Sequence, residues 1–131
     1  MPLSTYLANA LRDHVAGASS DDYSPYTAPQ NIYYSLLNAA TAGAFTEVSG
    51  TTYARSSGLF AVTAGKLISQ GVETWTVHDL DNWQTITHLG VHDASSGGNY
   101  LWYIPMSPNI AAPASGDILS LGAYGLQLDF E

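Results

Sequence analysis

The clearest structural signal in the chain lies in Trp83-Gln-Thr-Ile-Thr-His-Leu-Gly-Val-His-Asp93, followed by Ala94-Ser-Ser-Gly-Gly98 and then by Asn99-Tyr-Leu-Trp-Tyr-Ile104. In its first part, one set of side chains alternates with another in the period-2 pattern of a β-strand: Ile86, His88, Gly90 and His92 against Thr85, Thr87, Leu89 and Val91. The last part is a second strand, rich in aromatic residues. The middle part holds residues that tolerate positive φ or hydrogen-bond their own backbone. We therefore predict an antiparallel hairpin with a loop longer than the minimal turn.

Outward from this hairpin, short apolar segments bounded by turn residues predict further strands at 32–37, 58–62, 72–78, 118–121 and 126–130. We expect the last two to pair with each other around Gly122 and Gly125, and Lys66 to lie in a turn. About eight short strands at this spacing are typical of an all-β sandwich or barrel. The chain is thus predicted to be mainly β, an antiparallel β-sandwich or jelly-roll-like domain.

Three prolines constrain the segment after the hairpin. Pro105, Pro108 and Pro113 confine residues 105–115 to an edge or a loop, because proline donates no hydrogen bond to a central ladder.

The N-terminal segment predicts one short amphipathic helix over residues 4–16. Ser4 is a good N-cap, and Leu3, Leu7, Leu11 and Val15 recur every four residues before Gly17. We expect this stripe to pack on the chain's own sheet or across a subunit boundary, and the alternative is docking on another protein. Residues 1–17 then form the helix, 18–30 an extended loop and 31–131 the β part of a single domain, 1–131.

Composition excludes several partners. The 131 residues carry a net charge of −8, with three basic residues, no cysteine and no apolar run long enough to cross a membrane. Binding to a phosphate backbone requires several clustered Lys or Arg side chains, so we expect neither nucleic acid nor membrane as a partner. The many tyrosines and tryptophans are typical of protein interfaces or of sugar-binding faces.

Motifs for chemistry are absent from the sequence. His88 and His92 lie about 13 Å apart along a strand, too far for both to bind one ion. Asp21-Asp22 has too few neighbouring oxygen ligands and is typical of a solvated turn. No nucleophile elbow, metalloprotease motif or phosphate loop occurs. We predict no enzyme, no metal and no cofactor.

Several motifs follow one another in a fixed order: Leu7-Ala-Asn-Ala-Leu-Arg-Asp-His14, Tyr26 to Pro29, Tyr33 to Leu36, Glu47 to Arg55, Trp83 to Gly90, Asp93-Ala94, Gly97-Gly98 and Gly116-Asp117. In this order the whole chain resembles small structural proteins of tailed bacteriophages that are commonly labelled tail-fibre proteins. The unbroken block from Glu47 to Arg55 is the most specific part. The chain departs from the family pattern at His92, where Phe is usual, and residues 65–80 match only in outline.

The resemblance implies a non-enzymatic component of the virion. A fibre shaft would show repeats or heptads, and none occur, so we favour a capsid decoration protein on the outer shell. The alternatives are a small tail-fibre or baseplate-tip protein that contacts the host, and a glycan-binding module. The expected partners are the major capsid protein or tail proteins, and copies of the chain in a trimer or dimer, assembled in the bacterial host cytoplasm.

Seven side chains are the candidates for interface or structural anchors: Glu47, Tyr53, Arg55, Trp83, Trp102, Leu7 and Leu11. Within this set, Glu47 and Arg55 have opposite charges and would pair if the loop brought them together; the alternative is that each is simply exposed.

Overall fold

A computed structural model of the chain describes residues 3–16, 31–50, 52–63, 66–78, 82–122 and 127–129. The predicted N-terminal helix is confirmed as α1 (Thr5–Ala16). Ser4 caps it, since its Oγ accepts a hydrogen bond from the Leu7 amide at 3.2 Å. Leu7 is buried to 2% exposure in the same core as the sheet, so the helix packs on its own chain. No helix in the described ranges is long and apolar enough to cross a membrane.

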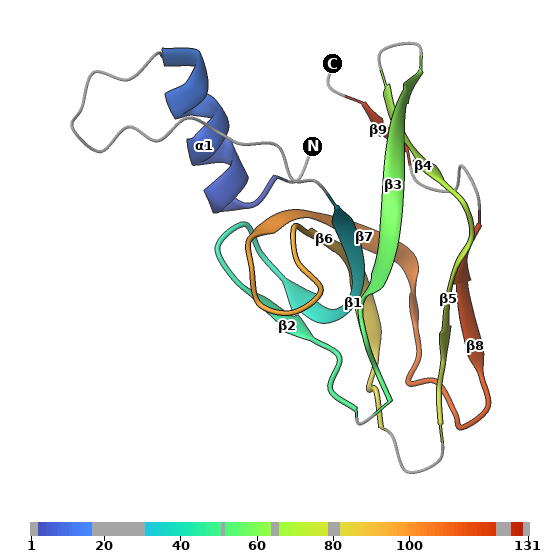
Figure 1. Cartoon of the computed structure of the whole chain (residues 1–131). Coiled ribbons are helices and arrows are strands. Elements are labelled where there is room, and N and C mark those ends of the chain that lie inside the picture. The colour runs from blue at the N-terminus through green and yellow to red at the C-terminus, as the bar shows by residue number, and fades with distance from the viewer. Residues whose placement is uncertain are drawn as a thin grey trace.

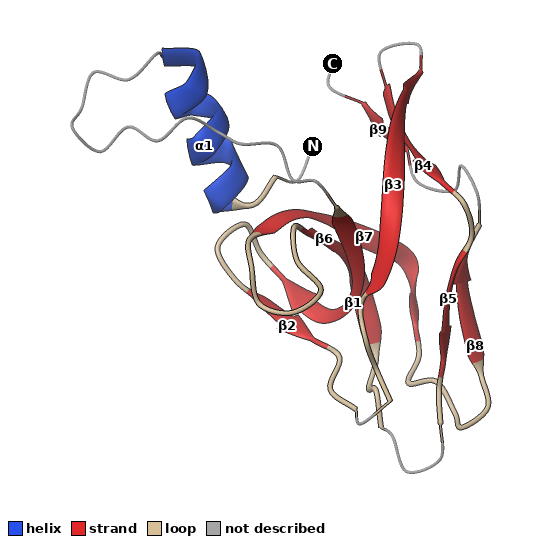
Figure 2. Cartoon of the chain, viewed as in Figure 1, coloured by secondary structure: helices blue, strands red, loops and turns tan. Residues whose placement is uncertain are grey.

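Strands make up most of the remaining described residues (Figure 2). They are β1 (Ile32–Ala40), β2 (Phe45–Glu47), β3 (Ser56–Thr63), β4 (Lys66–Gln70), β5 (Glu73–Thr76), β6 (Ile86–His92), β7 (Tyr100–Ile110), β8 (Ile118–Leu121) and β9 (Gln127–Asp129). All pairings between them are antiparallel. The predicted class, mainly β with one short N-terminal helix, is confirmed.

The strands form two sheets of unequal size (Figure 1). The larger has seven strands in the order β7-β6-β1-β3-β4-β9, with β2 also paired to β1, and the smaller consists of β5 and β8. Trp75 of the small sheet, Leu36 and Leu89 of the large sheet, and Trp83 share one buried cluster. The apolar layer between the sheets is thus the core of the described structure.

The hairpin of β6 and β7 is confirmed, with Leu89 opposite Ile104 and Val91 opposite Trp102. Its first strand begins at Ile86 and not at Trp83, because the backbone turns at Gln84, which has a φ of 60°. The Asn38 side-chain amide donates to the Trp83 and Thr85 carbonyls, each at 2.8 Å, and so satisfies the backbone where the ladder is missing.

The second strand of the hairpin is longer than predicted. It continues through Pro105 and Pro108 to Ile110. Because β7 is the end strand of the large sheet, the prolines lie on an edge, as expected.

Three expectations about other strands are wrong. The segments 118–121 and 126–130 do not pair with each other in the described structure: β8 pairs with β5, and β9 with β4. Lys66 does not lie in a turn but begins β4, which pairs with β3. The segment 72–78 gives only the shorter strand β5. Residues 18–30, with Asp21-Asp22, lie outside the described residues.

Candidate functional site

A break in strand pairing lies at one edge of β1. Along this edge β2 pairs with Leu37 and β3 pairs with Tyr34, so Leu36 lies between the two partner strands. Its carbonyl accepts a hydrogen bond from the Val48 amide at 3.0 Å. Its amide donates to the Tyr53 hydroxyl, also at 3.0 Å. A tyrosine side chain therefore supplies the acceptor that a continuous neighbouring strand would have given.

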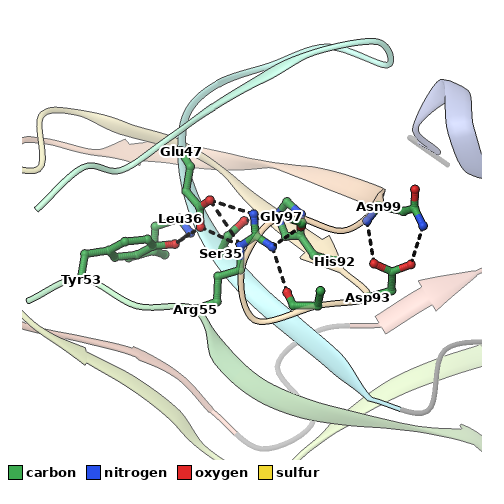
Figure 3. A network of polar contacts seen from close by, with 10 residues as sticks. Ser35, Leu36, Glu47, Tyr53, Arg55, His92, Asp93, Gly97 and Asn99 are labelled. Atoms are coloured by element: carbon green, nitrogen blue, oxygen red, sulfur yellow. Dashed lines mark hydrogen bonds and ion pairs between the residues drawn. The ribbon is translucent and has the colours of Figure 1, made fainter.

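Tyr53 belongs to a polar network with Glu47 and Arg55 (Figure 3). Its hydroxyl donates to Glu47 Oε2 at 2.7 Å. Arg55 donates to the same carboxylate from Nε at 3.0 Å and from Nη2 at 2.9 Å, in a two-pronged pair. The side chain of Arg55 is 6% exposed and that of Glu47 is 21% exposed. Of the two alternatives left open by the sequence, the ion pair is the one present, and it is largely shielded from solvent.

The remaining nitrogen of Arg55 reaches the loop of the β6–β7 hairpin. Nη1 donates to the carbonyls of Ala94 and Gly97, each at 2.9 Å. The loop is closed at its base by Asp93, whose carboxylate accepts from the Asn99 amide at 2.6 Å and from its side chain at 2.8 Å. Gly97 has a φ of 62°, a conformation that favours glycine. Arg55 therefore ties the broken edge of β1 to the hairpin that organises the sheet.

The network fixes the charge of its members. Burial by itself would raise the pKa of the Glu47 carboxyl, but the hydrogen bonds from Arg55 and Tyr53 and the charge of Arg55 together bring the pKa below its usual value. Burial, with the carboxylate beside it, raises the pKa of the Tyr53 hydroxyl. At neutral pH Glu47 is thus a carboxylate and Tyr53 a neutral donor.

A buried serine and histidine lie next to this network. Ser35 Oγ and His92 Nε2 are 2.7 Å apart, and both residues are 0% exposed. His92 Nδ1 has no hydrogen-bond partner within the described ranges. Burial, reinforced by the Arg55 charge, lowers the pKa of His92 to about 4.

This arrangement does not make a nucleophile. A catalytic serine needs access to substrate and a base that a third group orients. Here the serine is fully buried, and the orienting atom of the histidine is unpaired among the described residues. Gly90 shows how tightly the pair is packed, since a Cβ there would lie 2.4 Å from Ser35 Oγ. The pair is part of the packing between β1 and β6.

The other candidate residues lie in or against the core. Trp83 is 1% exposed and packs edge-on against Tyr53, with ring centroids 5.6 Å apart. Trp102 is 8% exposed, and Leu11 packs against the buried cluster that contains Leu7. The structure therefore brings Glu47, Tyr53, Arg55 and Trp83 together, and places Trp102, Leu7 and Leu11 elsewhere in the core. None of the three tryptophans offers an exposed ring face to a sugar.

The surface above the network presents few groups that are available to bind a ligand. A cleft of about 380 Å³ opens there, lined by Glu47, Tyr53, Arg55 and the loop residues 95–97. Every nitrogen of the Arg55 guanidinium already donates a hydrogen bond within the chain, so the cleft presents no uncommitted cation to an anion. The described ranges contain no group of three His, Cys, Asp or Glu side chains placed to hold a metal. The hydrogen bonds of Glu47, Tyr53 and Arg55 thus form an internal brace of the fold.

Two parts of this site, and the nearby contacts of Asn38, could not be or were not predicted from the sequence. The role of the Ala94 and Gly97 carbonyls as acceptors for Arg55 cannot be predicted from residue type, because every residue has a backbone carbonyl. The Ser35–His92 contact joins residues 57 positions apart. Asn38 had a visible signal, a polar residue at the end of an apolar strand, which typically marks a side chain that satisfies backbone groups.

Comparison with known families places the chain in context. The family model described as Podophage GP4 fiber I protein gp80 matches residues 2–129, nearly the whole chain. No curated protein matches the chain.

Proposed function

The chain belongs to the family described as Podophage GP4 fiber I protein gp80, and we propose that it is a non-enzymatic subunit of an external fibre of the particle. The resemblance to tailed-phage structural proteins is confirmed by the family match. A structural role in the phage virion, in association with other virion proteins, follows from this membership. The position within the particle, the lack of catalysis and the contacts with neighbouring subunits are parts of the proposal.

One observation supports the proposal that the protein is not an enzyme. In the block from Glu47 to Arg55, which is the most specific to the family resemblance, the side chains of Glu47, Tyr53 and Arg55 form an internal brace. An enzyme keeps at least one reactive group accessible to substrate, whereas the Arg55 side chain is 6% exposed and donates to acceptors in two other segments of its own chain, β2 and the β6–β7 loop. Such a brace suits a subunit that must keep its shape under mechanical load.

The proposed role of Glu47, Tyr53 and Arg55 at an interface is indirect. Their side chains hold the hairpin loop, and the exposed residues Ser95 and Ser96 at its tip are positioned by this support. We place the contact with neighbouring virion proteins at this loop and on the outer surface of the particle, after assembly in the host cytoplasm.

Capsid decoration is the second candidate. A net charge of −8 with only three basic residues suits a protein that covers a shell from outside, away from packaged DNA. The family description names a fibre, and this favours the fibre as first choice.

Copy number separates the two candidates. Quantitative mass spectrometry of purified particles, normalised to the major shell protein, measures it. A fibre subunit is present in far fewer copies than the shell protein, and a decoration protein is present within a few-fold of it. A ratio near that of the shell protein would overturn the fibre assignment in favour of decoration, and absence from purified particles would overturn both.

A further inference from the structure

The small sheet ends in a strand edge with no neighbour in the described part of the chain. It consists only of β5 and β8, and in Figure 1 β8 lies at the right-hand margin of the molecule. A two-stranded sheet is marginally stable by itself. Exposed edges are usually protected by proline, charge or a bulge. β8 reads Ile118-Leu-Ser-Leu121 and has neither proline nor charge.

The register shows which backbone groups face outward. The Val77 amide donates to the Asp117 carbonyl at 2.9 Å, and Leu119 lies opposite Trp75 two positions further along. Hydrogen-bonded pairs alternate along an antiparallel ladder, so Leu119 bonds to β5. The N–H and C=O groups of Ile118 and Ser120 therefore point to the free edge. The side chain of Ile118 is also 65% exposed.

We propose that β8 pairs antiparallel with β8 of a second copy of this chain around a two-fold axis centred on Leu119. In this register Ile118 of each copy exchanges both backbone hydrogen bonds with Ser120 of the other. The two small sheets then become one continuous four-stranded sheet. The contact is isologous, because the same edge serves both copies.

Packing and charge both favour a second copy as the occupant. The two Leu119 side chains meet on the inner face, at an apolar cleft of about 210 Å³ that Met106 and Ile110 also line. Asp117 lies opposite Leu121 of the other copy. The two Asp117 carboxylates are then about 13 Å apart along the strands, beyond the Debye length of roughly 8 Å at physiological salt. The edge strand itself, residues 118–121, carries no charged side chain despite the net charge of −8.

Single cysteines test the register, since the chain has none of its own. Leu119→Cys places two thiols in a non-hydrogen-bonded pair with a Cα separation of about 4.5 Å, within the range of a disulfide. Ser120→Cys places them on a diagonal of about 7 Å or more, which is too far. We expect mild oxidation to give a covalent dimer with Leu119→Cys and not with Ser120→Cys. Equal cross-linking of the two variants, or none with a folded Leu119→Cys, would overturn the register.

Backbone variants test the edge without touching the core. The unmodified chain should sediment as a dimer of twice 13.9 kDa. Ser120→Pro removes one outward N–H and should weaken dimerisation roughly tenfold or more, whereas Ser120→Ala keeps the amide and should leave it unchanged. A monomer at the highest soluble concentration, a trimer, or equal dimerisation of the two variants would overturn the proposal. These tests use the isolated chain, so their failure leaves the virion role untouched.

Discussion

Replacing Arg55 with alanine tests the brace most severely. The change leaves the Glu47 carboxylate, 21% exposed, without its cation, and leaves the Ala94 and Gly97 carbonyls without their donor. Removing one partner of a buried ion pair costs about 3–5 kcal/mol, and the residual exposure of Glu47 favours the lower end. We expect the free energy of unfolding to fall by about 3 kcal/mol, and the melting temperature by roughly 10 °C. Urea denaturation and calorimetry measure both.

A matched control separates bracing from charge. Arg12→Ala removes the same side chain and the same charge from an exposed position on α1, so its effect should stay within about 0.5 kcal/mol. Arg55→Lys should fall between the two, because an ammonium does not reproduce the planar fork that reaches both Glu47 and the loop. If Arg55→Ala unfolded at the same urea concentration as Arg12→Ala, the brace would have no role in stability.

Three further predictions follow from buried contacts. The pKa of His92 is lowered to about 4 in the folded chain from an ordinary 6.5. The neutral, buried His92 therefore contributes about 3 kcal/mol to the free energy of unfolding above pH 6.5, and this contribution is lost as pH falls toward 4. Urea titrations at several pH values should show that the free energy of unfolding falls more steeply with decreasing pH for the wild type than for His92→Phe across this window. Tyr53→Phe leaves the Leu36 amide unpaired, lowers the free energy of unfolding by about 1–3 kcal/mol and speeds hydrogen exchange of that amide. An unchanged exchange rate would show that the hydroxyl does not protect the amide. Gly90→Ala forces a Cβ into a packed contact and should cost about 1–3 kcal/mol, whereas Gly122→Ala, with open space around it, should be neutral; equal melting temperatures would contradict the packing.

Local signals in the sequence were sufficient to predict the elements whose formation depends on neighbouring residues. The alternation around Leu89 predicted β6, and the small residues at 94–98 predicted the hairpin loop. Ser4 and the leucine stripe predicted α1. Opposite charges at Glu47 and Arg55, eight positions apart, made the ion pair one of two outcomes that the sequence left open.

Pairing between distant segments was not accessible in this way. β8 and β9 are close in sequence and each has the composition of a strand, yet they pair with β5 and β4, because the choice of neighbour depends on the whole sheet. β4 was missed because Lys66 and the polar end of the segment hide a short strand. Glu47, Tyr53 and Arg55 were named from the sequence as interface or structural anchors, but their contacts could not be predicted. Tyr53 completes a broken strand edge, which only the three-dimensional arrangement reveals.

Electron microscopy of purified particles labelled with gold-conjugated antibody fragments locates the protein on the virion. We expect gold on fibres that project from the particle, with little label over the shell. Uniform label over the capsid surface would contradict the fibre and indicate decoration. Particles without label, from a preparation in which the antibody binds the purified chain, would contradict a place on the outer surface of the virion.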